Sequence, residues 1–238
     1  MIPKIIHYCW FGNGPMTEDA AECMDSWKKH LPDYELMRWD ETSFDIGSTI
    51  FTKEAYENRK YAFVADYIRL WALHNHGGIY FDVDVEVLKP LDPFLSYKAF
   101  CGFEDETHIS TAVIGSEKNG EWAKDQLDYY TDRHFIMPDG TPNTTTNVQI
   151  ISKMMAGQGF DLHNSRQSFK GIVEVFPQDF FSPKSFVSGK IRITENTCCI
   201  HHFSGSWLNP WQKCKKSAKY IIFKLGLYPL ARRMLRKT

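Results

Sequence analysis

Residues 77–87 of the chain read GGIYFDVDVEV, a glycine turn followed by an apolar strand that carries two carboxylates. From Ile79 to Val87 apolar and polar side chains alternate, which is the pattern of a half-buried β-strand. Asp82 and Asp84 are two residues apart, so we expect them to project from one face of that strand. Two close carboxylates repel each other unless a proton or a cation lies between them. The pair therefore predicts a site for a hard divalent metal ion, and a solvated polar face on an edge strand is the alternative.

The segments around this stretch predict an α/β fold. Pro90 and Pro93 stop regular pairing soon after the strand, which places the carboxylates near its C-terminal end, where ligands bind in open α/β sheets. Apolar patterning predicts further strands at residues 2–8, 34–39, 99–103, 109–115, 172–176 and 197–200. It predicts helices at residues 17–30, 51–75 with a break near Arg59-Lys60, 119–130 and 147–155. The opening strand, helix, strand order is typical of nucleotide-binding α/β domains.

The charge distribution divides the 238-residue chain in two. The formal net charge is −1, but residues 212–238 hold nine of the 28 basic residues and none of the 29 acidic ones. We therefore expect an α/β domain over residues 1–211 and a basic, amphipathic, helical segment over residues 212–238. An anionic membrane surface is the first interpretation of that segment, and a helix packed on the domain is the second. Nucleic acid is the least favoured partner, because the body of the chain is acidic.

The cysteines and the N-terminus indicate a reducing compartment. The six cysteines show no metal-ligand spacing, and we expect free, mostly buried thiols. They are Cys9, Cys23, Cys101, Cys198, Cys199 and Cys214. The N-terminus lacks the pattern of a targeting segment, and no window is apolar enough to span a bilayer. The expected location is cytoplasmic.

Two further groups of residues are candidates for ligand contact. Asp66 and Arg69 share one face of the predicted helix that leads into the glycine turn, where the alternative is an ordinary surface ion pair. Trp10 lies at the tip of the first strand, where its ring can stack on a nucleobase or form a lid over the core.

The sequence HHFSGSW at residues 201–207 follows the last predicted strand. Neighbouring side chains point in opposite directions, so one of His201 and His202 is expected to face a metal that carboxylates already hold. A purely structural histidine pair is the alternative. A mixed carboxylate and imidazole set favours Mn²⁺ over Ca²⁺.

Four motifs together resemble the family 32 glycosyltransferases, which carry the "DXD" signature. They are IPKIIH at residues 2–7 with Trp10, AD-x-x-R at 65–69, GGIY-x-D-x-D at 77–84 and HH-x-x-GSW at 201–207. The family includes capsular polysaccharide enzymes and initiating mannosyltransferases. The resemblance covers residues 2–207, and it implies a GT-A fold with a Rossmann-like mixed sheet, a nucleotide-sugar donor and retention of anomeric configuration.

The resemblance also implies roles for individual residues. Asp82 and Asp84 would bind Mn²⁺ (or Mg²⁺), with His201 or His202 completing the metal shell, and Asp66 and Arg69 would hold the donor sugar. Together, the two aspartates of the motif and this pair form the expected catalytic set. The remaining expected donor contacts are His7, Trp10, Tyr80, Asn147, Ser206 and Trp207. The segment TTTNV at residues 144–148 departs from a Gly-Pro pair common in relatives, and Ser110-Thr111 stands where an Asn is common, so the acceptor is the least determined feature.

The leading hypothesis is a metal-dependent retaining glycosyltransferase at the inner membrane face that uses a UDP-hexose. It would extend a glycan or lipid-linked saccharide in surface polysaccharide synthesis. A GDP-mannose-dependent mannosyltransferase of the same fold is the first alternative. Two other classes are a phosphohydrolase of the haloacid dehalogenase type, which also uses an Asp-x-Asp strand, and a non-catalytic carbohydrate-binding module.

Overall fold

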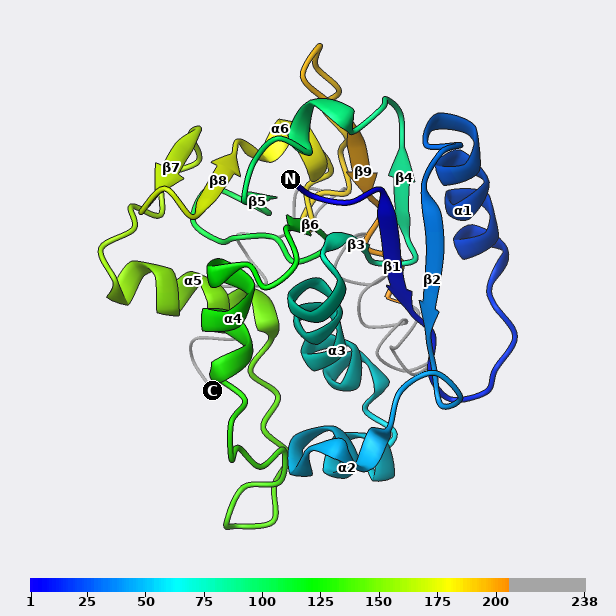
Figure 1. The fold of residues 1–238 in the computed structure, drawn as a ribbon, viewed down its shortest axis with the longest axis vertical. Helices are drawn as coiled ribbons and strands as arrows, with labels where there is room; N and C mark the ends of the chain where they lie inside the picture. Colours follow the sequence, from blue (N-terminus) through cyan, green and yellow to red (C-terminus); the bar gives the residue numbers. More distant parts are fainter. Residues whose placement is uncertain (206–238) are drawn as a thin grey trace, which may run out of the picture.

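The computed structural model describes residues 1–205, which form a mixed α/β structure around a seven-stranded sheet (Figure 1). The strand order is β2 (Glu35–Trp39), β1 (Ile5–Cys9), β3 (Gly78–Phe81), β6 (Val113–Ser116), β5 (Ala99–Gly102), β8 (Val173–Phe176) and β7 (Gln167–Phe169). A second, two-stranded sheet pairs β4 (Val85–Val87) with β9 (Cys199–His201). Parallel pairing joins β1 to β2 and β3, and β5 to β8, whereas β6 runs antiparallel to both of its neighbours. The predicted mixed sheet is therefore confirmed.

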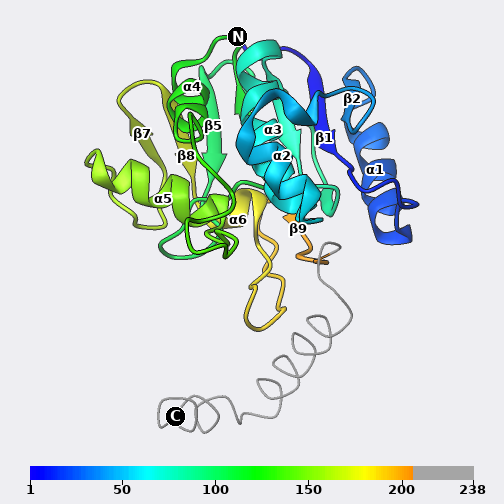
Figure 2. The same ribbon diagram turned by 90° about the horizontal axis from the view of Figure 1, so that it is seen from below.

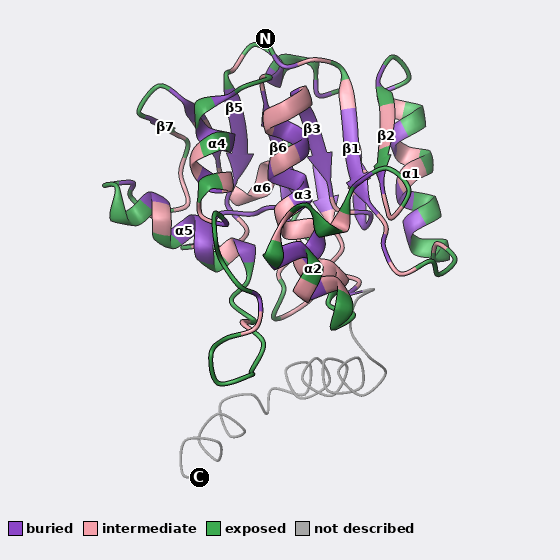
Figure 3. Cartoon of the chain, turned by 60° about the horizontal axis from the view of Figure 1, so that its bottom comes forward, coloured by how far each residue is buried: buried purple, intermediate pink, exposed green. Residues whose placement is uncertain are grey.

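Helices and the small sheet cover the two faces of the large sheet. The helices are α1 (Glu18–His30), α2 (Ile50–Glu57), α3 (Tyr61–His76), α4 (Glu121–Asp128), α5 (Asn147–Gly157) and α6 (Gln178–Phe181), with 3₁₀ turns at Ile46–Ser48 and Asp92–Phe94. One apolar core joins the sheet to α2, α3, α4 and α5, and a second joins it to α1, α6 and the small sheet. In Figure 3 the buried central strands lie behind the partly exposed helices of the first layer.

The expected helix boundaries agree closely with the structure. Thr17 caps α1, and its side chain accepts a hydrogen bond from the backbone N–H of Ala20 at 3.3 Å. The predicted break near Arg59-Lys60 separates α2 from α3, where Arg59 has a φ of 56°. Such a left-handed residue ends an α-helix. The short strand β7, the short helix α6 and both 3₁₀ turns were not predicted.

The GGIYFDVDVEV stretch differs from its prediction in two respects. It is not one strand, because β3 ends at Phe81 and β4 begins at Val85 in the other sheet. It is not half-buried either, since Tyr80 packs in the first core while Ile79 and Phe81 pack in the second. Both faces of a central strand are covered in this layered fold. The alternation of apolar and polar side chains therefore did not indicate a solvent-exposed face.

The two glycines set the path of the chain into β3. Gly77 and Gly78 have φ values of 69° and 120°. A Cβ at Gly78 would lie 2.6 Å from the carbonyl oxygen of Ile5, and one at Gly77 would lie 2.6 Å from the backbone nitrogen of Lys118. Only glycine fits this close approach of the turn to β1 and to the segment that follows β6.

Candidate metal and donor site

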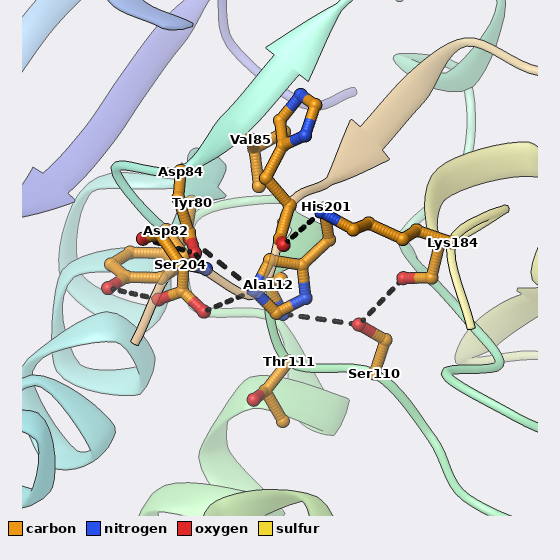
Figure 4. A network of polar contacts seen from close by, with 12 residues as sticks. Tyr80, Asp82, Asp84, Val85, Ser110, Thr111, Ala112, Lys184, His201 and Ser204 are labelled. Atoms are coloured by element: carbon orange, nitrogen blue, oxygen red, sulfur yellow. Dashed lines mark hydrogen bonds and ion pairs between the residues drawn. The ribbon is translucent and has the colours of Figure 1, made fainter. Parts of the chain in front are cut away.

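The turn between β3 and β4 carries both aspartates of the DXD motif. The N–H of Val85 donates to the carbonyl oxygen of Asp82 at 3.0 Å and closes the turn. Val85 then pairs with His201 across the small sheet. The fold thus brings an imidazole from the far end of the described chain to the two carboxylates, as Figure 4 shows.

Asp82, Asp84 and His201 form a cluster that fits a divalent cation. One ligand atom of each residue lies within 4.8 Å of the other two. The His201 Nε2 atom lies 3.4 Å from Asp84 Oδ1 and 4.0 Å from Asp82 Oδ2, both beyond a strong hydrogen bond. These separations leave room for an ion between the three atoms, and the donor set suits Mn²⁺ or Mg²⁺ by its chemistry.

His202 is the exception among the four predicted metal ligands. Its Nε2 atom lies 2.8 Å from Glu86 Oε2, and its backbone N–H donates to the carbonyl oxygen of Asp84. Its side chain therefore pairs with Glu86 and is absent from the cluster. Adjacent residues of a strand point to opposite faces, which explains why only one histidine faces the carboxylates.

Ser204 fixes the orientation of Asp84. Its backbone N–H and its hydroxyl both donate to Asp84 Oδ2, at 2.7 and 3.0 Å. Burial alone would raise the pKa of Asp84, but His201 and these two hydrogen bonds outweigh it and hold the pKa well below its usual range. Asp84 is consequently a carboxylate at neutral pH with Oδ1 turned toward His201. Ser204 was not singled out from the sequence, although it lies inside the quoted HHFSGSW motif.

Arg69 is buried and connects α3 to the DXD turn. Its Nη2 atom lies 2.8 Å from Asp66 Oδ1 and 3.4 Å from Asp82 Oδ1. Its Nη1–H donates to the carbonyl oxygen of Thr111 at 2.7 Å. The guanidinium carbon lies 4.6 Å from the centre of the Tyr80 ring, and the Tyr80 hydroxyl donates to Asp82 at 3.1 Å. The alternative of an ordinary surface ion pair is therefore wrong.

Burial changes the pKa values of two carboxyl groups in this region. Burial raises the pKa of Asp66 to about 6, against the opposing effect of the Arg69 charge. Burial also raises the pKa of Glu104, whose charge interacts with those of His201 and Asp82. Glu104 was not singled out from the sequence, because no local pattern links it to the DXD motif.

Asn147 lies beside this group at the first position of α5. Thr146 and Gln149 form a capping box that begins the helix. The Asn147 Nδ2–H donates to the carbonyl oxygen of Asp66 at 3.2 Å, and Oδ1 is buried with no hydrogen-bond partner among residues 1–205. A buried amide oxygen without a partner is costly, so it marks a position where a ligand hydroxyl would be stabilised.

His7 was expected to contact the nucleotide-sugar donor, but it lies inside the protein. It is fully buried, with Nε2 2.7 Å from the carbonyl oxygen of Gly77, and Nδ1 accepts a hydrogen bond from the Trp39 indole. Both ring nitrogens are engaged, and burial lowers the pKa of His7 to about 4. This geometry supports a structural role in joining β1 to the glycine turn.

Trp10 is half-buried, and its indole N–H donates to the carbonyl oxygen of Gly14 at 2.8 Å. It packs against the second core, so stacking on a base and covering the core both remain compatible with its position. Ser206, Trp207 and the basic segment at residues 212–238 lie outside the described residues. The five cysteines that the structure describes are free and buried, as predicted.

Comparison with known proteins supports the DXD glycosyltransferase family. Residues 17–101 match the family model described as "Glycosyltransferase sugar-binding region containing DXD motif". The chain is 32% identical over 171 residues to the mannosyl phosphorylinositol ceramide synthase SUR1 of Saccharomyces cerevisiae, which covers 64% of this chain and 41% of that protein. It is 35% identical over 121 residues to inositol phosphoceramide mannosyltransferase 3 of Schizosaccharomyces pombe, covering 49% of this chain and 34% of that protein.

The chain thus aligns with less than half the length of these curated relatives. A solved glycosyltransferase "involved in the glycosylation of the major capsid of PBCV-1" superposes with a TM-score of 0.51 at 14% identity, covering 91% of this chain and 99% of that one. This likeness confirms the GT-A fold. The matches support a glycosyltransferase enzyme over the phosphohydrolase and binding-module alternatives. Among the described helices, none combines the length and apolar character needed to cross a bilayer.

Proposed function

We propose that this chain is a metal-dependent, retaining glycosyltransferase that moves a hexose, preferably mannose, from a nucleoside diphosphate sugar to a lipid-linked acceptor. The observation that carries the proposal is the cluster of Asp82, Asp84 and His201 at the end of the central strand β3. Both aspartates lie inside the segment that matches the DXD family model.

The residues of the cluster have the chemistry that this reaction needs. Breaking the bond between sugar and nucleotide releases a diphosphate, and negative charge grows on it in the transition state. A divalent ion held by the three side chains would neutralise that charge as a Lewis acid. Ser204 holds Asp84 in one orientation, and Arg69 holds Asp82, so the ligands are positioned before a substrate binds.

Asp66, Arg69 and Asn147 are the proposed contacts to the donor sugar. Arg69 is fixed by its bonds to Asp66 and to the Thr111 carbonyl oxygen, which leaves it little freedom to move. The free Oδ1 of Asn147 is suited to accept a hydrogen bond from a sugar hydroxyl. Tyr80 is better described as a positioning residue, because its hydroxyl is bonded to Asp82 and its ring stacks under Arg69.

The named relatives shift the preferred donor. From the sequence alone, a UDP-hexose is the expected donor and GDP-mannose is the alternative. The relatives from both yeasts are named as enzymes of mannosyl transfer to inositol phosphoceramide, which favours a mannosyl donor and a lipid acceptor here. A peripheral position at a membrane follows from a lipid acceptor, and surface polysaccharide synthesis is the less favoured setting.

A donor screen tests the proposal. Purified protein with Mn²⁺ would be incubated with GDP-mannose, UDP-glucose or UDP-galactose, and released nucleotide would be measured with and without inositol-containing lipid. We expect release from GDP-mannose that requires metal and is lost in Asp84→Asn. Glu86→Gln is the matched control, because Glu86 pairs with His202 outside the cluster. Release that is equal without metal, or equal in Asp84→Asn, would overturn the proposal.

A further inference from the structure

The segment between α6 and β9 forms a hairpin, residues 184–193, that projects from the body of the protein. Lys184 and Ile191 pair across it as an isolated antiparallel bridge. In Figure 2 this segment extends beyond the sheet, next to the end of β9. Its sequence, KSFVSGKIRI, contains three basic residues and no acidic one.

The hairpin concentrates the exposed apolar side chains of the described chain. Residues 1–205 have seven large hydrophobic side chains that are exposed, and four of them lie here. They are Phe186 (65% exposed), Val187 (52%), Ile191 (44%) and Ile193 (61%). Single exposed hydrophobic residues are ordinary, but a local group of four indicates a contact surface.

Basic side chains accompany this apolar group. Lys190 and Arg192 are exposed, and neither forms an ion pair with a carboxylate within the described residues. Apolar side chains flanked by unpaired cations match the interface of an anionic bilayer, where the former enter the acyl boundary and the latter meet lipid phosphates.

The base of the hairpin is connected to the metal cluster. The Lys184 Nζ–H donates to the carbonyl oxygen of His202 at 2.7 Å. The Phe186 ring lies 5.4 Å from the Phe203 ring, which in turn lies 4.0 Å from the imidazole of His201 (centroid distances). A surface that the hairpin touches is therefore close to the proposed site of sugar transfer.

We propose that residues 184–193 insert into the interface of an anionic lipid bilayer and hold the active site against it. The hairpin is a different stretch of sequence from the basic segment at residues 212–238. The proposal deepens the proposed function by giving a lipid-linked acceptor a direct route to the metal cluster. Its test is independent of catalysis, because it measures insertion.

An environment-sensitive fluorophore on the hairpin tests insertion directly. The five described cysteines are buried, so a Cys214→Ser background with Val187→Cys takes the label at residue 187. Met137→Cys is the matched control, since Met137 is a similarly exposed apolar side chain (43%) outside the hairpin, on the loop between α4 and α5. With vesicles of phosphatidylcholine and 30% phosphatidylserine, we expect a blue shift and a rise in emission at residue 187 and no change at 137.

Charge and apolar variants complete the test in the full chain. Lys190→Gln should weaken vesicle partition about fivefold, the factor expected for one interfacial cation. Phe186→Ser with Ile193→Ser should abolish the blue shift at residue 187, while Ile50→Ser should not, because Ile50 is exposed on α2. An unchanged spectrum at residue 187, whether or not the protein sediments with vesicles, would overturn the proposal. Sedimentation without that change would assign the membrane contact to another surface.

Discussion

Replacing Arg69 with methionine should destabilise the fold strongly, because Arg69 neutralises two carboxylates in a buried setting. Its side chain is 5% exposed, and those of Asp66 and Asp82 are 13% and 26% exposed. Arg69→Met keeps most of the apolar stem but removes every bond to Asp66, Asp82 and the Thr111 carbonyl oxygen. Breaking a buried ion pair from one side costs about 3–5 kcal/mol, since the remaining charge is left without a partner.

The assay is urea unfolding of wild type and variant at pH 7.5. We expect the free energy of unfolding to fall by about 3 kcal/mol or more, and the melting temperature to fall by about 10 °C. The double variant Arg69→Met with Asp66→Leu should recover part of this loss, because it removes one of the stranded carboxylates. Lys28→Ala is the control, since Lys28 pairs with Asp25 on the surface and should cost under about 1 kcal/mol.

A loss in Arg69→Met as small as that in Lys28→Ala would refute this reasoning. It would mean that water reaches Asp66 and Asp82 well enough to solvate them without the guanidinium. A double variant less stable than Arg69→Met alone would instead show that Asp66 is stabilised by groups other than Arg69.

Two further predictions concern histidines. Burial lowers the pKa of His7 to about 4, below its unfolded value of 6.5, so the unfolded chain binds a proton more readily and stability should fall by about 3 kcal/mol as the pH drops from 7 to 4. His7→Gln should flatten that part of the urea-unfolding pH profile, and an unchanged slope would contradict the assignment. His201→Ala should weaken Mn²⁺ binding by at least about tenfold in calorimetry, while His202→Ala should leave it within about threefold, and a reversed order would reject the cluster as drawn.

Much of the fold could be predicted because local patterns determine it. The beginning of α1 after Thr17, the break at Arg59 and the glycine turn at residues 77–78 each depend on a few neighbouring residues, and each was recognisable in the sequence. The division of GGIYFDVDVEV between two sheets was not recognisable. It depends on α1, whose Trp27 indole donates to the carbonyl oxygen of Val85, and on β9, more than 100 residues further along the chain.

In the candidate site, too, the features that depend on distant segments of the chain could not be predicted from the sequence. The residue types of the metal cluster were predictable, because two carboxylates two residues apart and a pair of adjacent histidines are both local patterns that indicate metal ligands. The choice of His201 over His202 required the register of β9 against β4, in which Val85 lies opposite His201. The free amide oxygen of Asn147 and the nearness of Glu104 arise only from packing between distant segments, for which one sequence holds no signal.

The most direct test of the central claim is calorimetric titration of nucleotide into the wild type and Asp84→Asn, with and without Mn²⁺. We predict that GDP binds the wild type in the presence of Mn²⁺, and that affinity falls at least about tenfold when either the metal or the Asp84 carboxylate is removed. Glu86→Gln should bind as the wild type does. Nucleotide binding that is equally tight with and without Mn²⁺, or unchanged in Asp84→Asn, would contradict a metal-bridged donor site at Asp82, Asp84 and His201.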